Sequence, residues 1–314
     1  AMAALGEAVP AGDDTLGAPD HPRDREAAWW DEWVQVQIER AWVHYWLAQP
    51  EAMRALVDRV APVVEARGSA AQRARFYQAV VHGGFREGKY RVTAEMVAAA
   101  EHSLDAAREA NDLAGLSYAR FVYGMVFFFE GRLAEAEARL REAYDDTGLT
   151  GDVVMRLRCV TYRMLARRLR GAVDDTTALA DEVLALATRL KMEDYVGAAH
   201  ACVGWAAWRR GDLAIAEAEA RAALETWEVL AAKYAYPLTW TARLVVLALM
   251  NLRDVTPQAI AHVEALRGPT QQRLPVVLED AADGALAAWR RGDLDATLRS
   301  LENVLLTARA IGYL

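Results

Sequence analysis

Trp-Arg-Arg-Gly-Asp-Leu, at residues 208–213, recurs unchanged at residues 289–294, each time between two segments with the apolar periodicity of a helix. Steps of 40 residues back from Gly211 reach Gly171 and then Gly131. Glycine is the residue best suited to the left-handed backbone of a tight turn. Turn glycines at one fixed period therefore indicate a repeat of two helices joined by a short turn.

Small residues at fixed offsets from the turn support the same repeat. Gly204 precedes the turn and Ala216 follows it, and 80 residues earlier Gly124 and Ala136 stand at the same offsets. The tetratricopeptide pattern places small residues where its two helices cross closely. We therefore predict a close crossing of the two helices at these positions.

Weaker turns extend the series along the chain. They fall at residues 49–50, near Gly88, near Asn251 and at Gly292. The sequence thus predicts an all-α fold, a right-handed solenoid resembling tetratricopeptide (TPR) repeats. It should hold about seven antiparallel helix pairs with a period of about 40 residues and helices of about 15 to 18 residues.

Residues that favour helix ends agree with this division. Pro50 and Pro257 suit the first turn of a second helix, and Thr256 suits the N-cap before it. Gly68 and Gly268 suit C-terminal caps. Helix boundaries are therefore expected at all five positions.

Composition limits the function classes. A net charge of −8 disfavours nucleic acid and anionic membranes as partners, because both attract a basic surface. The two cysteines, Cys159 and Cys202, lie in apolar helical segments and indicate buried thiols in a reducing compartment. No membrane-spanning run and no signal peptide are recognised, so we expect a cytoplasmic protein.

The chain is expected to have two parts. Residues 1–23 predict a flexible N-terminal segment that opens with a cloning remnant. Residues 24–314 predict a single TPR-like solenoid domain.

Several motifs also resemble a known group of proteins. They lie at residues 45–50, 73–76, 208–213, 271–275 and 312–314. Through these motifs, residues 29–314 resemble the C-terminal TPR region of large bacterial ATP-binding signalling proteins. In those proteins an AAA- or STAND-type ATPase is linked to a nucleotidyl cyclase or transcription-regulator output. The resemblance implies a regulatory sensor or scaffold, with an output or ATPase domain attached at the N-terminal end.

Signals for catalysis are weak. Residues 83–89 match the spacing of a phosphate-binding loop, but Tyr90 stands where a magnesium-binding Ser or Thr is needed, so a helix end is expected there. Asp174 and Asp175 follow a turn, where they should cap a helix, although with residues 181–182 they could hold a divalent ion. No histidine pair has metal-binding spacing. We predict no enzyme activity, no cofactor and no metal.

The remaining candidate is the concave face, which in such solenoids is lined by the first helix of each pair. Arginines among aromatic side chains suit a protein segment or a small anionic effector, because arginine forks onto carboxylates and aromatic faces bind cations and apolar groups. The residues that this count predicts to bind a ligand are Arg75, His82, Phe85, Arg86, Phe121, Phe128, Arg158, Arg168, Trp205, Trp208 and Arg209. Aromatic residues at helical spacing often belong to the core, so we expect about half of these residues to be packing residues. Groove arginines of this kind are not expected to hold the stack together.

A second group of aromatic residues stands before the repeats. Trp29, Trp30, Trp33 and Trp42 are expected to pack as a cap, or as a docking face for a domain beyond the N-terminal end.

Three functions remain open from the sequence. The first is a non-catalytic binding module that passes occupancy to an attached domain. The second is a structural scaffold that forms a homodimer and has no groove ligand. An enzyme inside a helical shell is the third, and dispersed carboxylates in a closed pocket would favour it.

Overall fold

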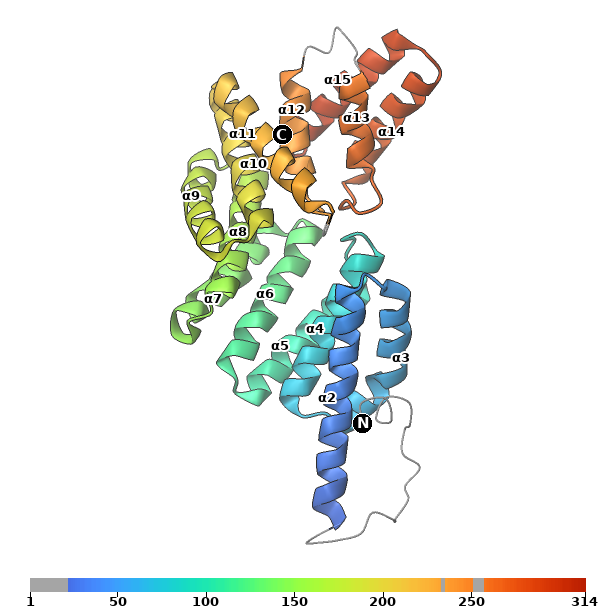
Figure 1. The fold of residues 1–314 in the computed structure, drawn as a ribbon, viewed down its shortest axis with the longest axis vertical. Coiled ribbons are helices and arrows are strands. Elements are labelled where there is room, and N and C mark those ends of the chain that lie inside the picture. The colour runs from blue at the N-terminus through green and yellow to red at the C-terminus, as the bar shows by residue number, and fades with distance from the viewer. Residues whose placement is uncertain (1–21, 233–234, 251–256) are drawn as a thin grey trace. The chain divides into compact units, whose positions relative to one another are not determined.

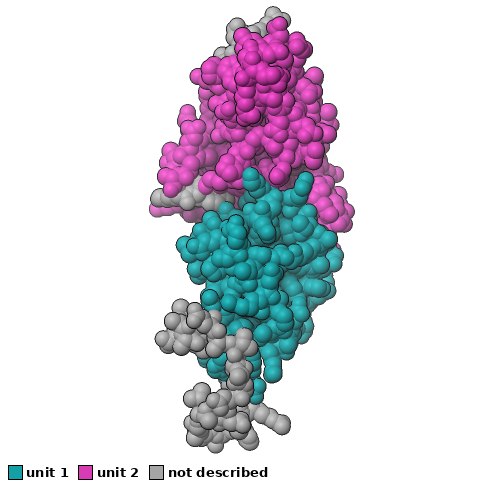
Figure 2. Space-filling model, turned by 90° about the vertical axis from the view of Figure 1, so that its right-hand side faces the viewer, with its two compact units in different colours: residues 1–126 teal, residues 127–314 magenta. Residues whose placement is uncertain are grey.

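The computed structural model describes residues 22–232, 235–250 and 257–314, and these residues form helices joined by short turns, without a strand (Figure 1). The contacts between Cα atoms divide the chain into two compact units, residues 1–126 and 127–314, which Figure 2 colours separately. The all-helical prediction is confirmed. The single solenoid over residues 24–314 stays a prediction.

Unit 1 contains α2 to α5 and most of α6. The helices are α2 (Pro22–Trp46), α3 (Pro50–Arg67), α4 (Ala70–Glu87), α5 (Ala94–Ala110) and α6 (Leu113–Glu130), and the last of these carries the boundary between the units.

Unit 2 continues with nine helices in its described residues. They are α7 (Leu133–Thr150), α8 (Val153–Leu169), α9 (Val173–Leu190), α10 (Glu193–Arg210), α11 (Leu213–Leu230), α12 (Trp240–Leu249), α13 (Pro257–Leu266), α14 (Val276–Arg290) and α15 (Leu294–Ala310).

The predicted turns separate the two helices of each pair. Gly131, Gly171, Gly211 and Gly292 all have positive φ, from 71° to 88°. Pro50 and Pro257 begin α3 and α13, and Gly68 ends α3 as its C-cap. Thr256 and Asn251 lie outside the described residues. The helix-pair register read from the repeat is therefore confirmed at every turn that the structure describes.

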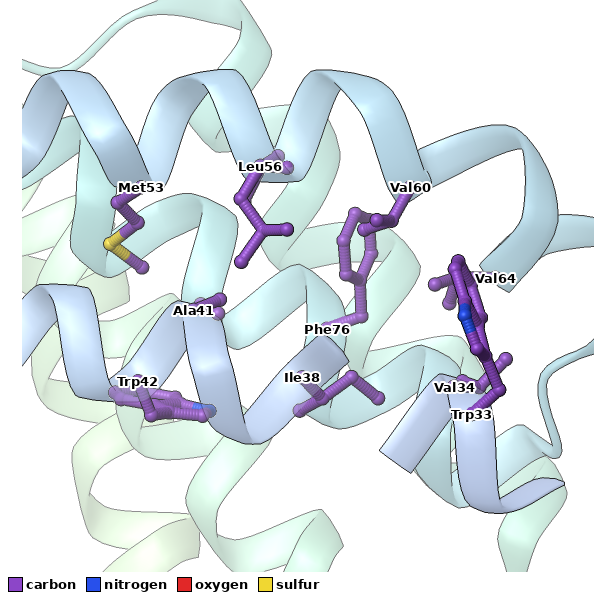
Figure 3. Packing of buried hydrophobic residues seen from close by; sticks show 12 residues of the cluster. Trp33, Val34, Ile38, Ala41, Trp42, Met53, Leu56, Val60, Val64 and Phe76 are labelled. Atoms are coloured by element: carbon purple, nitrogen blue, oxygen red, sulfur yellow. The ribbon is translucent and has the colours of Figure 1, made fainter. Parts of the chain in front are cut away.

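One core cluster of unit 1 lies between α2, α3 and α4 (Figure 3). Ile38 and Trp42 of α2 face Met53 and Val60 of α3, and Phe76 of α4 closes the layer. Apolar residues repeat at helical spacing along α2 and α3, so each helix buries one face. Packing of Trp33 and Trp42 is confirmed, because both are buried here, whereas a docking role for the four tryptophans stays a prediction.

The predicted close crossing is present between α10 and α11. Ala216 is fully buried, and a β-carbon at Gly204 would lie 3.0 Å from the backbone nitrogen of Ala220 and 3.1 Å from the carbonyl oxygen of Ala216. Gly204 therefore lets two helix backbones approach each other.

First helices of successive pairs also pack side by side in unit 2, where α8 contacts α10 and α10 contacts α12. This is the arrangement expected of a TPR-like repeat. The last pair departs from it, because α15 rather than α14 packs against α12. As a result the end of α15 lies near α10, which the 40-residue period alone does not predict.

No helix in the described ranges is long and apolar enough to cross a membrane.

Candidate functional site

The predicted residues of unit 1 gather around His82 on α4. Its Nδ1 donates a hydrogen bond to the carbonyl oxygen of Gln78 at 2.8 Å, and its Nε2 lies 3.4 Å from the hydroxyl of Tyr118 on α6. Trp42 and Tyr45 of α2 meet the imidazole edge to face, with ring centroids 5.1 and 5.5 Å away. Three first helices thus contribute to one aromatic cluster, and His82 itself is buried in it.

Two arginines flank this cluster at more accessible positions. Arg75 is exposed, forms an ion pair of 3.1 Å with Glu39 and lies over the ring of Trp42 at 6.0 Å. Arg86 is half-buried and lies over the ring of Tyr45 at 4.7 Å. Arginines stacked on aromatic rings hold their guanidinium groups in a fixed orientation. Of the predicted residues in unit 1, these two can present charge to a partner.

Other predicted residues are packing residues. Phe85 and Phe121 of unit 1 and Phe128 of unit 2 are buried, and Phe128 meets Tyr162 edge to face at 5.5 Å. Counting back from each turn glycine identifies the inner face of the first helix. It does not show which residues on that face are covered by a neighbouring helix. The expectation that these three side chains line an open groove is corrected by their burial.

Arg168 on α8 shows the largest difference from expectation. It is fully buried, donates hydrogen bonds to the carbonyl oxygens of Ala201 at 3.0 Å and Thr241 at 2.6 Å, and lies between the indoles of Trp205 and Trp240. No carboxylate of a described residue forms an ion pair with it, and burial lowers its pKa. Arg168 therefore links α8, α10 and α12, and the prediction that it is an accessible groove residue is wrong.

The contacts of Arg168 continue to further groups and form a chain of ring and guanidinium contacts, which we call the ladder. Its members, in spatial order, are Tyr313, Trp240, Arg168, Trp205 and Arg209. Tyr313 and Trp240 have ring centroids 4.5 Å apart, and Arg209 lies over Trp205 at 5.3 Å. Trp205 is fully buried. Only Arg209 is an exposed member of this ladder.

The ladder includes residues that sequence reasoning did not assign to any site. Trp240 donates from its indole nitrogen to the side-chain oxygen of Gln272 at 2.9 Å, and burial raises the pKa of Tyr313 to about 12. A β-carbon at Gly312 would lie 2.6 Å from the carbonyl oxygen of Leu169. The sequence indicates only a resemblance at residues 271–275 and 312–314. No sequence signal shows that Gln272 and Tyr313 both contact Trp240, because these residues are far apart in the chain.

The two remaining predicted residues, Trp208 and Arg158, are half-buried on different helices of unit 2. Trp208 is half-buried, and the guanidinium of Arg309, from the last turn of α15, lies over its ring at 5.1 Å. Arg158 of α8 is half-buried, and its charge opposes the rise that burial produces in the pKa of Asp194. Arg309 is a further residue that the repeat count did not find.

The weak catalytic motifs have structural explanations. Residues 83–87 continue α4, which ends at Glu87. Asp174 and Asp175 lie in the first turn of α9, as expected, but its N-cap is Ala172, so the expected side-chain cap is wrong. Instead Asp174 pairs with Arg210 at 2.6 Å and Asp175 with Arg167 at 2.8 Å. In the described part of the chain no group of His, Cys, Asp and Glu is arranged to hold a metal.

Both cysteines are buried free thiols. Burial raises the pKa of Cys159 to about 12 and also raises the pKa of Cys202. A thiol is nucleophilic as its thiolate, so neither side chain is suited to nucleophilic chemistry at neutral pH. The prediction of two buried thiols is confirmed.

His262 provides a prediction for pH dependence. Burial, with the charges of Arg243 and Arg221, lowers its pKa from 6.5 to about 4, and the guanidinium of Arg243 lies 3.4 Å from its Nδ1. Between these two pH values the unfolded chain binds a proton that the folded chain does not, so stability falls as the pH falls from 6.5 to 4. We expect the titration of His262 to lower the free energy of unfolding by about 1 to 2 kcal/mol between pH 6.5 and pH 4, because partial exposure screens the full effect.

Urea unfolding of the parent and of His262→Asn from pH 4 to pH 7 measures this contribution. Other titrating groups affect both proteins equally, so the difference between the two curves reports His262. A difference that stays constant across the window would contradict the prediction.

Comparisons with known proteins concern the fold. No family model matches the chain, and no curated protein matches it. The apo form of RapI superposes with a TM-score of 0.55 at 10% sequence identity, covering 93% of this chain and 89% of RapI. The STAND protein PH0952 from Pyrococcus horikoshii, described as having a tetratricopeptide repeat sensor, superposes with a TM-score of 0.53 at 13% identity.

The match to PH0952 covers 74% of this chain but 35% of PH0952, so this chain spans about a third of that protein's length. At these identities both likenesses establish the fold alone. The fold is a TPR-like helical repeat, as the sequence predicted.

Proposed function

We propose that this chain is a non-catalytic binding module that recognises a protein segment or a small anionic effector on the inner faces of its first helices. The observation that carries the proposal is the set of accessible arginines held over aromatic rings, Arg75 and Arg86 in unit 1 and Arg209 in unit 2. The rings hold the guanidinium groups in a fixed orientation, and forked N–H donors in a fixed orientation suit carboxylate-bearing ligands.

In this proposal the module is the regulatory sensor or scaffold of a bacterial cytoplasmic protein for signalling or transcription control. PH0952 supports the sensor role, because its matched part is a fraction of a longer STAND protein with a repeat sensor. An ATPase or other output domain attached at the N-terminal end would then read whether the sensor is occupied. Nucleic acid and membrane are not among the proposed partners, since the chain carries a net charge of −8.

Native mass spectrometry of the protein purified from its own host tests the binding function. We expect a mass increment from a retained effector or a complex with a second protein, and we expect its population to fall as salt rises, because an anionic partner is attracted by charge. Charge reversal at Arg75 and Arg86 together should lower the bound fraction. A bare monomer mass under all conditions, with no partner recovered, would overturn the proposal.

A homodimeric scaffold is the second candidate, and one observation favours it. Val43, Trp46 and Leu47, at the end of α2, are 53%, 69% and 61% exposed. Contiguous exposed apolar side chains often mark a protein interface. Analytical ultracentrifugation of the parent and of a Trp46→Ser, Leu47→Ser variant separates the candidates: a parent dimer that the variant loses, with no retained ligand, would favour the scaffold.

A further inference from the structure

The arginines at the carboxyl end of α10 and near it fall into two classes. Arg170 lies 3.0 Å from Glu137, Arg167 also contacts Glu137, and Arg210 lies 2.6 Å from Asp174. These three have carboxylate partners. Arg209 and Arg309 form no ion pair with a described residue, and each lies over an indole instead.

The stacked arrangement leaves donors for a ligand. A guanidinium that contacts an indole through its flat face still has five N–H donors around its edge, and it is held in place by the ring. Both arginines occupy the last turn of their helices, where the negative end of the helix dipole compensates part of the charge. That compensation, about 0.3 to 1 kcal/mol at an exposed position, does not satisfy the N–H edges.

Three elements build this place in the fold. Trp208 and Arg209 come from α10, and Arg309 from α15. The Nη1 atom of Arg209 would lie 3.7 Å from a β-carbon at Gly171, just after α8, and a β-carbon at Gly312, just after α15, would lie 2.6 Å from the carbonyl oxygen of Leu169 at the end of α8. We call Trp208, Arg209 and Arg309 the Trp208 site.

We propose that the Trp208 site binds an acidic protein segment, with Arg209 and Arg309 each receiving a carboxylate and the half-buried indole of Trp208 contacting an apolar side chain between them. This inference rests on the proposed binding function and names its partner. Charge complementarity carries it: two guanidinium groups without carboxylate partners stand on a protein whose net charge of −8 repels acidic segments elsewhere.

The openness of the site favours a segment of protein over a small molecule. Arg209 is exposed and Trp208 is half-buried, so a small anion would remain largely in water. Small-molecule sites bury most of their ligand, whereas a protein segment brings its own surface to cover the indole.

Fluorescence anisotropy with a fluorescein-labelled peptide of glutamate and leucine tests the proposal. The matched peptide with glutamine in place of glutamate tests the need for charge, and free glutarate as a competitor tests for a small dicarboxylate. We expect the parent to bind the acidic peptide, to ignore the glutamine peptide and to lose affinity as salt rises.

The decisive variant is Arg209→Gln with Arg309→Gln, for which we expect an affinity loss of at least about tenfold. The matched control is Arg291→Gln with Arg299→Gln, which removes the same charge from exposed arginines of the same unit and should bind like the parent. Far-UV circular dichroism verifies that the variants fold. The variant Arg209→Lys with Arg309→Lys keeps the positive charges but lacks the forked N–H donors of arginine, so it should bind with intermediate affinity.

The outcomes are separable. If the glutamine variant and the control lose equal affinity for the acidic peptide, the attraction comes from the overall charge of the protein, and the Trp208 site is wrong. Glutarate that binds as tightly as the peptide would overturn the choice of partner. If a partner retained from the host binds the glutamine variant as tightly as the parent, the Trp208 site is wrong while the binding function stands. If nothing is retained and no peptide binds, both fail.

Discussion

Replacing Arg168 with alanine is expected to lower the free energy of unfolding by about 3 to 5 kcal/mol. The substitution removes two charged hydrogen bonds, to the carbonyl oxygens of Ala201 and Thr241, and empties the space between two indoles. The cost of burying the cation offsets part of this loss, which is why the expected value is below the sum of the contacts. Equilibrium urea unfolding at neutral pH measures it.

Arg209→Ala is the matched control, because Arg209 lies over the same indole of Trp205 but is itself exposed. It should cost less than about 1 kcal/mol. Arg168→Met separates packing from hydrogen bonding, since methionine fills much of the space without charge. If Arg168→Ala is as stable as the parent, the ladder has no stabilising role. If Arg168→Met is as stable as the parent, that role comes from packing alone.

Replacing Gly204 with leucine is expected to destabilise the protein by about 3 kcal/mol, at the upper end of overpacking effects. Even a β-carbon there would lie 3.0 Å from the backbone of α11, and backbone atoms cannot move aside as a side chain can. The leucine must therefore separate α10 from α11, which also exposes the buried Ala216 and Ala220. Thermal and urea unfolding both report the change.

Gly284→Leu is the matched control for that substitution. Gly284 lies in the middle of α14, is exposed, and has no atom within 4 Å of where a β-carbon would stand. Leucine should therefore raise stability by about 0.5 to 1 kcal/mol, because glycine is a poor helix former. If both variants respond alike, helix propensity rather than the crossing determines the result at Gly204.

These effects bear on function through the separation of two kinds of arginine. Arg168 holds α8, α10 and α12 together, whereas Arg209 and Arg309 present donors at the surface. Mutations at the first position therefore test the scaffold, and mutations at the other two test the proposed partner. The sequence pattern predicts Arg168 and Arg209 on one inner face, whereas in the structure Arg168 is buried and Arg209 is exposed.

The sequence by itself determined the helical class, the helix-pair register and the crossing at Gly204. Each of these follows from local chemistry: glycine accepts the positive φ of the turn, proline suits a first turn, and a missing β-carbon permits close backbones. Such requirements concern neighbours within one pair, so a period of 40 residues reveals them.

Only the tertiary structure decided which of the inward-facing residues are accessible. Counting back from the turn glycines predicts Arg168, Trp205 and Arg209 on the same inner face, but Arg168 and Trp205 are fully buried, and Arg168 lies over Trp240 of the next pair. Arg309 reaches Trp208 because α15 packs against α12, against the order that the period predicts. Burial depends on contacts between residues far apart in the chain, and a repeat pattern specifies the face of each helix without specifying what lies over it.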